Sequence, residues 1–166
     1  MSVPRHCLKC GARLRTFLEE GFRRWRCARC AWVFYGNPVP ATVAVVVGPR
    51  GILMCRRAAA PYRGTWDLAG GFLEADESPD LGLSREIREE LGARVRRARF
   101  RGFVVDRYGR GGIPVLGLVY EVRVAGPITA RSDVSEVAWF PQDAIPWRRI
   151  GFASIRRALR AYLRSR

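Results

Sequence analysis

Lysine and histidine are almost missing from this 166-residue chain, in which Lys9 and His6 are the only residues of their types. Apolar runs are also short, and none approaches the ~18 residues that a membrane-spanning helix requires. The N-terminus carries charges and cysteines in place of an apolar signal segment, which favours an intracellular, cytoplasmic protein. Beyond two CxxC pairs, the sequence also has no internal repeat and no low-complexity tract. We therefore expect no membrane span.

Because lysine is so rare, the formal net charge of +15 comes almost entirely from arginine. One interpretation is a long-range field that attracts anionic substrates or nucleic acid. The alternative is a compositional bias that has replaced surface lysines by arginines. Arginine is scattered along the chain, which favours the second interpretation. A charge of this size still predicts weak, non-specific nucleic-acid binding at low salt.

The length of the chain fits one domain of ordinary size plus a small appendage. Apolar residues make up 48% of the sequence, which is enough for a real core and unlike a disordered protein. We therefore look for one main domain and a smaller unit beside it.

Two pairs of cysteines mark residues 1–36 as that smaller unit. Cys7 and Cys10 form one CxxC pair, Cys27 and Cys30 form the other, and sixteen residues separate the pairs. This is the spacing of a four-cysteine zinc ribbon. Two disulfides are the alternative, but they are unusual in a reducing compartment, and a redox motif needs only one pair. We expect a structural Zn²⁺ held by the four cysteines.

The ribbon has two possible roles. Its aromatic residues either stack on nucleic-acid bases or form the small core that a ribbon needs; they are Trp25, Trp32, Phe34 and Tyr35. The structural role is favoured. His6 is interpreted as a bystander, because four cysteines already complete a tetrahedral zinc site.

Local signals predict a helix between residues 78 and 92. Ser78 is a good N-cap, Pro79 fits the first helical position, and Gly92 fits a left-handed C-terminal residue. Leucine or isoleucine recurs every four residues at positions 83, 87 and 91, which predicts a buried stripe. The helix should therefore pack one face against the rest of the domain.

Three glutamates, Glu86, Glu89 and Glu90, fall within roughly 100° of arc on this helix. Like charges at this spacing repel one another, and a hard divalent cation such as Mg²⁺ would offset the repulsion. The alternative is a solvated acidic face neutralised by neighbouring arginines. The Gly70-Gly71 pair just upstream lets backbone approach a ligand closely, which favours a magnesium and diphosphate site.

The segment from Gly71 to Ala93 resembles the complete Nudix box. Gly71 is followed after five residues by Glu77, and after seven more by the run REIREELGA at 85–93. Ala69 departs from many relatives, which have proline before the two glycines. The resemblance covers roughly residues 40–165. It implies an α+β fold, a Nudix-type α/β/α sandwich with a mixed β-sheet over residues 37–166.

The resemblance also implies a reaction, the attack of water on a diphosphate linked to another group. In that family Glu86, Glu89 and Glu90 would bind Mg²⁺ or Mn²⁺, and Gly70 would add its backbone carbonyl. Glu77 would pair with Arg85 to brace the loop. The substrate would be a small nucleotide compound, and relatives often form homodimers.

The remaining chain predicts strands and one further helix. Apolar or β-branched runs predict strands at 41–47, 52–57, 95–106, 115–124 and 134–140, and 36–40 is expected to be an extended linker. A short helix is expected at 141–145, and a final helix from about 153 to 163. Cys55 falls within the second strand and is most simply a small buried residue.

Three further residues are candidate site residues. Arg63 and Trp66 stand upstream of the glycine pair, where Arg63 would hold a phosphate and Trp66 would contact a base or pack in the core. Asp133 and Glu136 are the notable carboxylates after the box. Glu136 is the better match by position, because it precedes Trp139 as a glutamate does in relatives, where it serves as a further ligand or as the general base. The alternative is an ordinary surface glutamate, and spacing alone does not decide between the two. One of the box glutamates is the alternative base.

The combination of ribbon, linker and box resembles the zinc-ribbon Nudix hydrolases, which include NADH pyrophosphatases and ADP-ribose pyrophosphatase-like proteins. The NADH-specific members carry a serine-glutamine-proline-tryptophan-proline-phenylalanine run after the box. This chain instead reads DRYGRGGIPVLG at 106–117. The resemblance therefore favours ADP-ribose or a similar compound. The alternatives are NADH, a nucleoside triphosphate, or a nucleic-acid-binding or nucleotide-sensing module without turnover.

Overall fold

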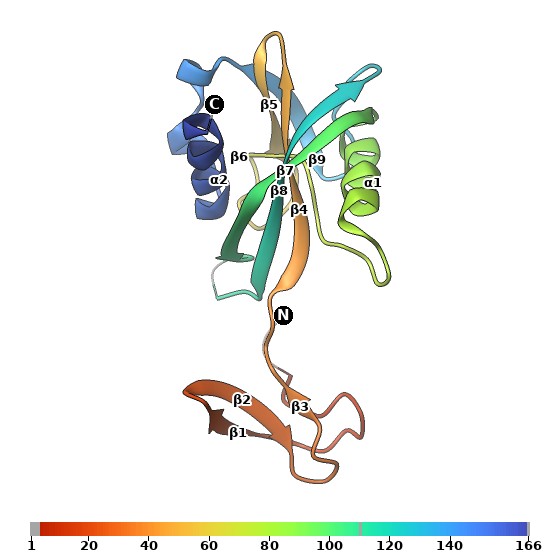
Figure 1. Cartoon of the computed structure of the whole chain (residues 1–166), viewed down its shortest axis with the longest axis vertical. Helices are drawn as coiled ribbons and strands as arrows, with labels where there is room; N and C mark the ends of the chain where they lie inside the picture. Colours follow the sequence, from red (N-terminus) through yellow and green to blue (C-terminus); the bar gives the residue numbers. More distant parts are fainter. Residues whose placement is uncertain (1–3, 110, 166) are drawn as a thin grey trace.

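The computed structural model describes residues 4–109 and 111–165, which form a small three-stranded sheet and a larger layered body (Figure 1). The small sheet contains β1 (Leu14–Glu19), β2 (Phe22–Cys27) and β3 (Val33–Phe34), all antiparallel in the order β1-β2-β3. It holds the four clustered cysteines. The larger body begins with the strand that follows.

A six-stranded mixed sheet lies at the centre of the larger body. Its strands run in the order β6-β5-β4-β8-β7, and β9 also pairs with β5. Strand β4 is parallel to β8, whereas the other pairs in this sheet are antiparallel. The strands are β4 (Val39–Gly48), β5 (Gly51–Arg57), β6 (Trp66–Asp67), β7 (Arg94–Arg107), β8 (Pro114–Ala125) and β9 (Val134–Phe140).

One helix covers each face of this sheet, α1 (Pro79–Leu91) and α2 (Ala153–Arg164), as Figure 1 shows. Strand β4 explains why both faces are covered, because side chains alternate between the faces of a strand. Val43, Val45 and Val47 pack in the cluster that includes α2, and Ala44 and Val46 pack in the cluster that includes α1. An unbroken apolar run is therefore buried on both sides.

Helix α1 has the ends that its sequence predicts. The Ser78 hydroxyl accepts a hydrogen bond from the backbone N–H of Leu81, and Gly92 ends the helix in the left-handed conformation at φ 66°. Leu83, Ile87 and Leu91 are all buried. The helix is thus fixed in place along one stripe, which leaves its glutamates beside the sheet.

The N-terminus of helix α2 is capped by a side chain from strand β7. Phe152 at its N-cap position offers no side-chain hydrogen bond, and Asp106 on β7 accepts one from the Ser154 N–H at 2.8 Å. Although burial opposes ionisation, the backbone N–H groups of Arg107 and Ser154 hold the pKa of Asp106 below its ordinary value. This contact ties α2 to the end of β7.

The observed fold agrees with the predicted α+β class and mixed sheet, with differences at the boundaries. The expected linker at 36–40 is shorter, because Val39 and Pro40 already pair with Val115 and Leu116 of β8. The expected helix at 141–145 is one 3₁₀ turn, Gln142–Ala144, and a second turn spans Trp147–Arg149. A division of the chain at residue 36 stays a prediction.

In the described ranges, neither helix has the length and apolar character that crossing a membrane would require.

Candidate active site and cysteine cluster

The loop before α1 depends on its two glycines. Gly70 has φ +137°, and a Cβ atom there would stand 2.2 Å from the carbonyl oxygen of Thr42. A Cβ at Gly71 would stand 2.4 Å from a carboxylate oxygen of Glu86. Position 70 therefore requires glycine, and any larger residue at position 71 would displace the Glu86 carboxylate. The backbone of this loop therefore lies directly against β4 and the acidic face of α1.

Arg85 holds the loop and the helix together. Its guanidinium donates to both carboxylate oxygens of Glu77, at 2.9 and 3.0 Å, and to the carbonyl oxygen of Phe72 at 2.9 Å. It also contacts Glu86 at 2.7 Å and Glu89 at 3.1 Å. The hydrogen bond from Arg85 keeps the pKa of Glu77 below its ordinary value. The structure thus brings together the pair that the sequence predicts.

Replacing Arg85 by alanine is expected to lower the free energy of unfolding by about 2 kcal/mol, because several charge-assisted hydrogen bonds are lost at once. It should also reduce activity, because the loop loses its attachment. Urea unfolding measures the first effect. Arg88→Ala on the exposed side of the same helix is the matched control and should stay within about 0.5 kcal/mol of the parent. Equal losses in both variants would contradict the bracing role.

A group of carboxylates lies where α1 faces the loop and the segment before β9. Glu90 is only 6% exposed and accepts a hydrogen bond from the Gly70 N–H at 2.9 Å. Burial raises its pKa to about 9; the hydrogen bond from Gly70 opposes the shift, and the charges of Asp133 and Glu86 add to it. Burial also raises the pKa of Glu86 despite its contact with Arg85.

These residues fit a divalent cation. The buried Glu90 and the half-buried Glu86 have raised pKa values, and the exposed Asp133 lies beside them, so ionising these carboxyl groups together needs a cation between them. All the available donors are oxygen atoms, which are the ligands that Mg²⁺ and Mn²⁺ prefer. The Gly70 carbonyl belongs to the same loop. The arrangement therefore provides an oxygen-lined site for a hard metal.

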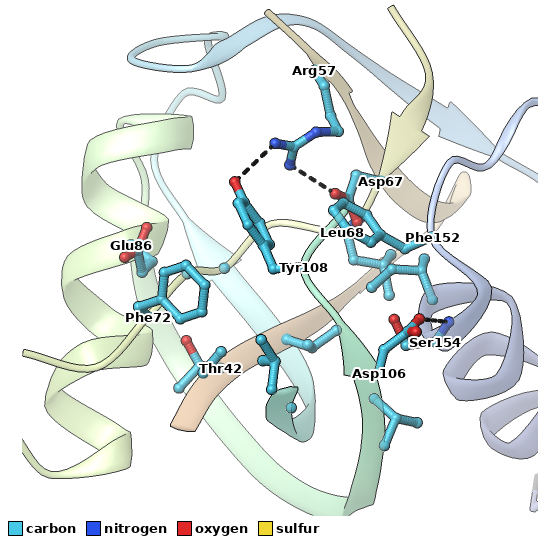
Figure 2. Close-up of a pocket in the computed structure, with 18 of the residues that line it drawn as sticks. Thr42, Arg57, Asp67, Leu68, Phe72, Glu86, Asp106, Tyr108, Phe152 and Ser154 are labelled. Carbon is cyan, nitrogen blue, oxygen red and sulfur yellow. Dashed lines mark hydrogen bonds and ion pairs between the residues drawn. The ribbon is translucent and has the colours of Figure 1, made fainter. Parts of the chain in front are cut away.

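An open cavity of about 360 Å³ begins at this acidic group. Gly70, Gly71, Glu86, Glu90 and Asp133 line one part of it. Three aromatic rings line another part, as Figure 2 shows: Phe72, Tyr108 and Phe152. The cavity therefore combines an acidic end with an aromatic wall, and a single ligand can contact both.

The aromatic rings are mutually packed. Tyr108 and Phe152 stack with centroids 5.7 Å apart, and Phe72 meets Tyr108 edge-on at 5.1 Å. These three residues come from the loop, β7's C-terminal side and the start of α2. Their contacts hold the wall in one arrangement.

Arg57 and Asp67 form a nearly buried ion pair in the cavity wall. The Arg57 guanidinium lies 3.0 Å from Asp67 Oδ2 and 3.3 Å from the Tyr108 hydroxyl (Figure 2). Burial raises the pKa of Asp67 to about 6, although the charge of Arg57 opposes the shift. The pair places one fixed cation and one carboxylate beside the aromatic rings.

Arg57→Met is expected to lower the free energy of unfolding by about 3 kcal/mol, because it leaves the Asp67 carboxyl buried without its partner. The double variant Arg57→Met/Asp67→Asn should recover much of that loss. Chemical denaturation of the parent, both single variants and the double variant gives the coupling energy. Additive losses would show that the two side chains act independently.

Several predicted site residues lie outside the cavity lining. Arg63 is exposed at the surface. Trp66 is 4% exposed in the core, with its ring 5.1 Å from that of Phe140, as its core interpretation expects. Glu136 lies on β9, half exposed, and pairs with Arg56 at 3.0 Å. Glu89 is half exposed and contacts Arg85 at the edge of the acidic group.

Sequence reasoning missed several residues of the cavity. Arg57, Asp67, Tyr108 and Phe152 carry no motif, and only the fold brings them to one place. Asp133, which the sequence singles out beside Glu136 without preferring it, lines the cavity three positions before Glu136. A hydrogen bond from the Arg131 N–H to the Glu90 carbonyl, at 2.9 Å, brings this segment to α1.

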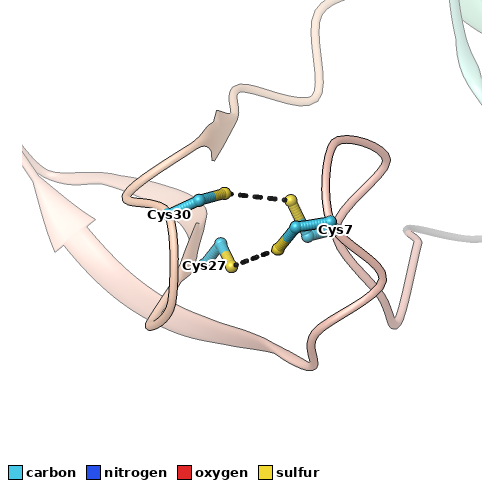
Figure 3. A group of neighbouring side chains, drawn as sticks. Cys7, Cys27 and Cys30 are labelled. Atoms are coloured by element: carbon cyan, nitrogen blue, oxygen red, sulfur yellow. Dashed lines mark hydrogen bonds between the residues drawn. The ribbon is translucent and has the colours of Figure 1, made fainter.

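The four cysteines of the small sheet converge on one point. Their sulfur atoms all lie within 4.8 Å of one another, and Figure 3 shows the sulfurs facing inward. Cys7 and Cys30 are 3.6 Å apart, and Cys10 and Cys27 are 3.5 Å apart. These separations exceed a disulfide bond. They are close to the edge of a tetrahedron with Zn–S distances of about 2.3 Å, so the cluster fits a zinc ion.

The ribbon's aromatic residues divide between two environments. Trp25, Trp32 and Phe34 pack against the cysteines, as the structural interpretation expects, whereas Tyr35 is 48% exposed. Among described residues outside the cluster, Cys55 is the one further cysteine; it is buried, and burial raises its pKa. Four cysteines thus form the cluster that fits zinc, whereas Cys55 is a buried core residue of the larger body.

Comparisons with known proteins agree with this geometry. A family model described as the NUDIX domain matches residues 37–162. A MutT-like protein of Streptomyces ambofaciens is 35% identical over 117 residues, which cover 70% of this chain and 72% of the relative. An ADP-ribose pyrophosphatase of Methanocaldococcus jannaschii is 28% identical over 114 residues, 68% of this chain and 67% of the relative.

A second kind of relative is longer than this chain. The NAD-capped RNA hydrolase NudC of Pseudomonas aeruginosa is 28% identical over 143 residues, and the match covers 86% of this chain. The chain spans about half the length of that relative, 49%. Among solved structures, a NUDIX hydrolase of Nitrosomonas europaea superposes with a TM-score of 0.77 at 28% identity, covering 98% of this chain and 92% of the other.

Proposed function

The chain belongs to the Nudix hydrolase family, and from this premise we propose that it cleaves the diphosphate bond of a nucleoside diphosphate linked to another group, with Mg²⁺ or Mn²⁺ as cofactor. The observation that carries the proposal is the cavity, which joins a buried carboxylate group to an aromatic wall. Its leading substrate is ADP-ribose. Each part of such a substrate has a counterpart in the cavity.

The acidic end would hold the metal and the diphosphate. Glu86 and Glu90 supply carboxylates there, Glu89 stands at the edge, and Gly70 offers its carbonyl. Bound at this site, Mg²⁺ supplies Lewis-acid polarisation of the diphosphate and a lowered pKa for water. Arg85 and Glu77 are positioning residues, because they fix the loop and the orientation of Glu86.

The general base is a carboxylate in this proposal, and geometry favours Asp133 over Glu136. Asp133 lines the cavity and lies close enough to Glu90 for its charge to raise the pKa of that carboxyl group. Glu136 is engaged with Arg56 at the surface. A base must come within hydrogen-bond reach of the attacking water. Asp133→Asn should therefore lower kcat far more than Glu136→Gln.

The aromatic end would hold the nucleoside. Phe72 and Tyr108 offer ring surface for a base, and Arg57 and Arg107 supply positive charge in the same wall. A relative named ADP-ribose pyrophosphatase supports ADP-ribose as the substrate. Relatives named NAD-capped RNA hydrolases keep NADH-like compounds as an alternative. The absence of the NADH-specific motif favours ADP-ribose over NADH.

The test is a panel of ADP-ribose, NADH, dATP and GTP, each assayed with Mg²⁺ for kcat/KM. We expect ADP-ribose to exceed the others by at least about tenfold, a difference of about 1.4 kcal/mol in transition-state binding. If NADH or a nucleoside triphosphate has the highest kcat/KM, the proposed substrate is wrong but the reaction type stands. If none of the compounds is hydrolysed, the proposed function is wrong.

The structural zinc and a homodimer belong to the same proposal. Zn²⁺ would hold residues 1–36 as a ribbon through Cys7, Cys10, Cys27 and Cys30. Dimerisation is a prediction from the family and is tested by sedimentation.

A further inference from the structure

The small sheet has an inner and an outer face with different chemistry. Paired residues of antiparallel strands share a face. Leu14 pairs with Cys27 and packs with it against the other cysteines, which defines the inner face. The outer face is offset by one position and carries three arginines, three aromatic residues and one glutamate: Arg15, Arg24, Arg26, Phe17, Phe22, Tyr35 and Glu19.

Arginine and aromatic side chains alternate on the outer face. The Arg26 guanidinium lies 4.2 Å from the centroid of the Phe17 ring. The Arg24 guanidinium lies between Phe22 and Tyr35, at 5.1 and 5.2 Å from their centroids. Phe22 is 61% exposed and Tyr35 is 48% exposed. Large rings thus stay accessible although they border cations.

The charge of this face is weakly balanced. Glu19 is the one acidic residue on it among those described, and its carboxylate stands 4.0 Å from both Arg24 and Arg26. The Arg24 guanidinium donates from Nη1 to the Tyr35 carbonyl oxygen at 3.1 Å, and its buried Nε atom has no hydrogen-bond partner in the described chain. Eight lysines and arginines against two glutamates occupy residues 1–36 as a whole. A polyanion therefore complements this surface.

We propose that the outer face binds single-stranded nucleic acid, with bases stacked on Phe22 and Tyr35 and phosphates held by Arg15, Arg24 and Arg26. Exposed rings bordered by cations are what unpaired bases and their backbone require. A duplex keeps its base faces stacked away from such rings. Arginine and aromatic residues are also common at protein interfaces. The excess of three arginines over one glutamate favours a polyanion, because a second copy of this face would repel the first. This binding lies beyond the proposed hydrolysis and uses a different surface.

The test uses the full-length, zinc-loaded protein and a fluorescent 12-nucleotide oligouridylate, with affinity measured by anisotropy. Phe22→Ala/Tyr35→Ala should weaken binding at least tenfold, because each stacked base is lost with its ring. The matched control is Phe103→Ala, which removes a ring from β7 of the larger sheet that is 68% exposed, more than either Phe22 or Tyr35. It should leave the affinity unchanged. Zinc content reports that the ribbon is intact in each variant.

A second variant tests the phosphate contacts. Arg15→Ala/Arg26→Ala should reduce the slope of log affinity against log salt by about 1.4, from about 0.7 for each phosphate contact to a single strand. Arg148→Ala, at an exposed site of the larger body, is the control. A slope that falls equally in both would indicate only a diffuse attraction to the net charge, and would overturn the site.

Two other results would overturn the proposal. One is an unchanged affinity in the Phe22→Ala/Tyr35→Ala variant with full zinc content. The other is a wild-type dimer in sedimentation that this variant dissociates, which would assign the face to a second copy of the chain. Hydrolysis of ADP-ribose should be the same in this variant and the parent. Loss of nucleic-acid binding can therefore be distinguished from loss of hydrolase activity.

Discussion

Glu90→Gln is expected to lower kcat by about 10³-fold while the protein remains folded. Glutamine keeps the size of the side chain and an oxygen that accepts the Gly70 N–H hydrogen bond. It removes the negative charge that the metal requires. Loss of one anionic ligand at a catalytic metal is worth several kcal/mol, and about 4 kcal/mol corresponds to 10³ in rate.

The fold should tolerate this change because the charge itself is costly where it lies. Glu90 is buried, and its raised pKa shows that the structure disfavours the ionised form in the absence of a cation. A neutral amide therefore should not lower the free energy of unfolding. Steady-state kinetics and thermal melting, with and without Mg²⁺, measure both effects.

The matched control is Asp80→Asn, which removes an exposed carboxylate from the first turn of the same helix. Its kcat should equal that of the parent, with at most about 1 kcal/mol lost from the interaction with the helix dipole. Full activity in the Glu90→Gln variant would remove Glu90 from the catalytic site. An equal loss in both variants would show a general effect on α1.

Removal of zinc is expected to unfold residues 4–36 and to leave the larger body folded. The ribbon's own core is small, since Cys7, Leu14 and Cys27 are the only buried residues among positions 4–36. Units below about 40 residues usually need a metal or disulfides. Structural zinc contributes about 10 kcal/mol or more in small domains of this kind.

Hydrogen exchange localises this effect. After treatment with a zinc-selective chelator, β1 and β2 should lose protection while β4 and α1 keep theirs. Cys27→Ser should give the same result without a chelator. Cys55→Ala removes a buried cysteine outside the cluster and should leave the ribbon protected. Protection of β1 and β2 in zinc-free protein would contradict a structural metal.

The parts of the site that the sequence predicts are those encoded locally. The ends of α1 follow from Ser78, Pro79 and Gly92, whose effects act within one turn. The pairing of Glu77 with Arg85 belongs to one contiguous motif. The strand β4 follows from its apolar run, and its burial on both faces agrees with that pattern.

The other parts depend on contacts between distant segments. Arg57 and Tyr108 are 51 positions apart and meet only because β5 and β7 lie in one sheet. The choice between Asp133 and Glu136 depends on where the segment before β9 touches α1, which spacing does not encode. Arg63 fails to reach the cavity because its loop faces solvent, although it is only seven residues from Gly70.

The outer face of the ribbon shows the same limit. Alternation along β1 and β2 separates arginines and rings from the cysteine side only once the strand register is known. The aromatic residues that the sequence singles out lie mostly in the inner core. The pairing of β1 with β2 places Phe17 and Phe22 on the outer face.

The most direct test of the central claim is ³¹P NMR of ADP-ribose incubated with the full-length protein and Mg²⁺. The account predicts AMP and ribose 5-phosphate as the only phosphorus-containing products, with no reaction when EDTA is present. It also predicts that the Glu90→Gln variant leaves the diphosphate resonances unchanged over the same period. Persistence of those resonances with the folded, zinc-loaded parent protein and Mg²⁺, or release of ADP, would contradict the assignment of this cavity to ADP-ribose diphosphate hydrolysis.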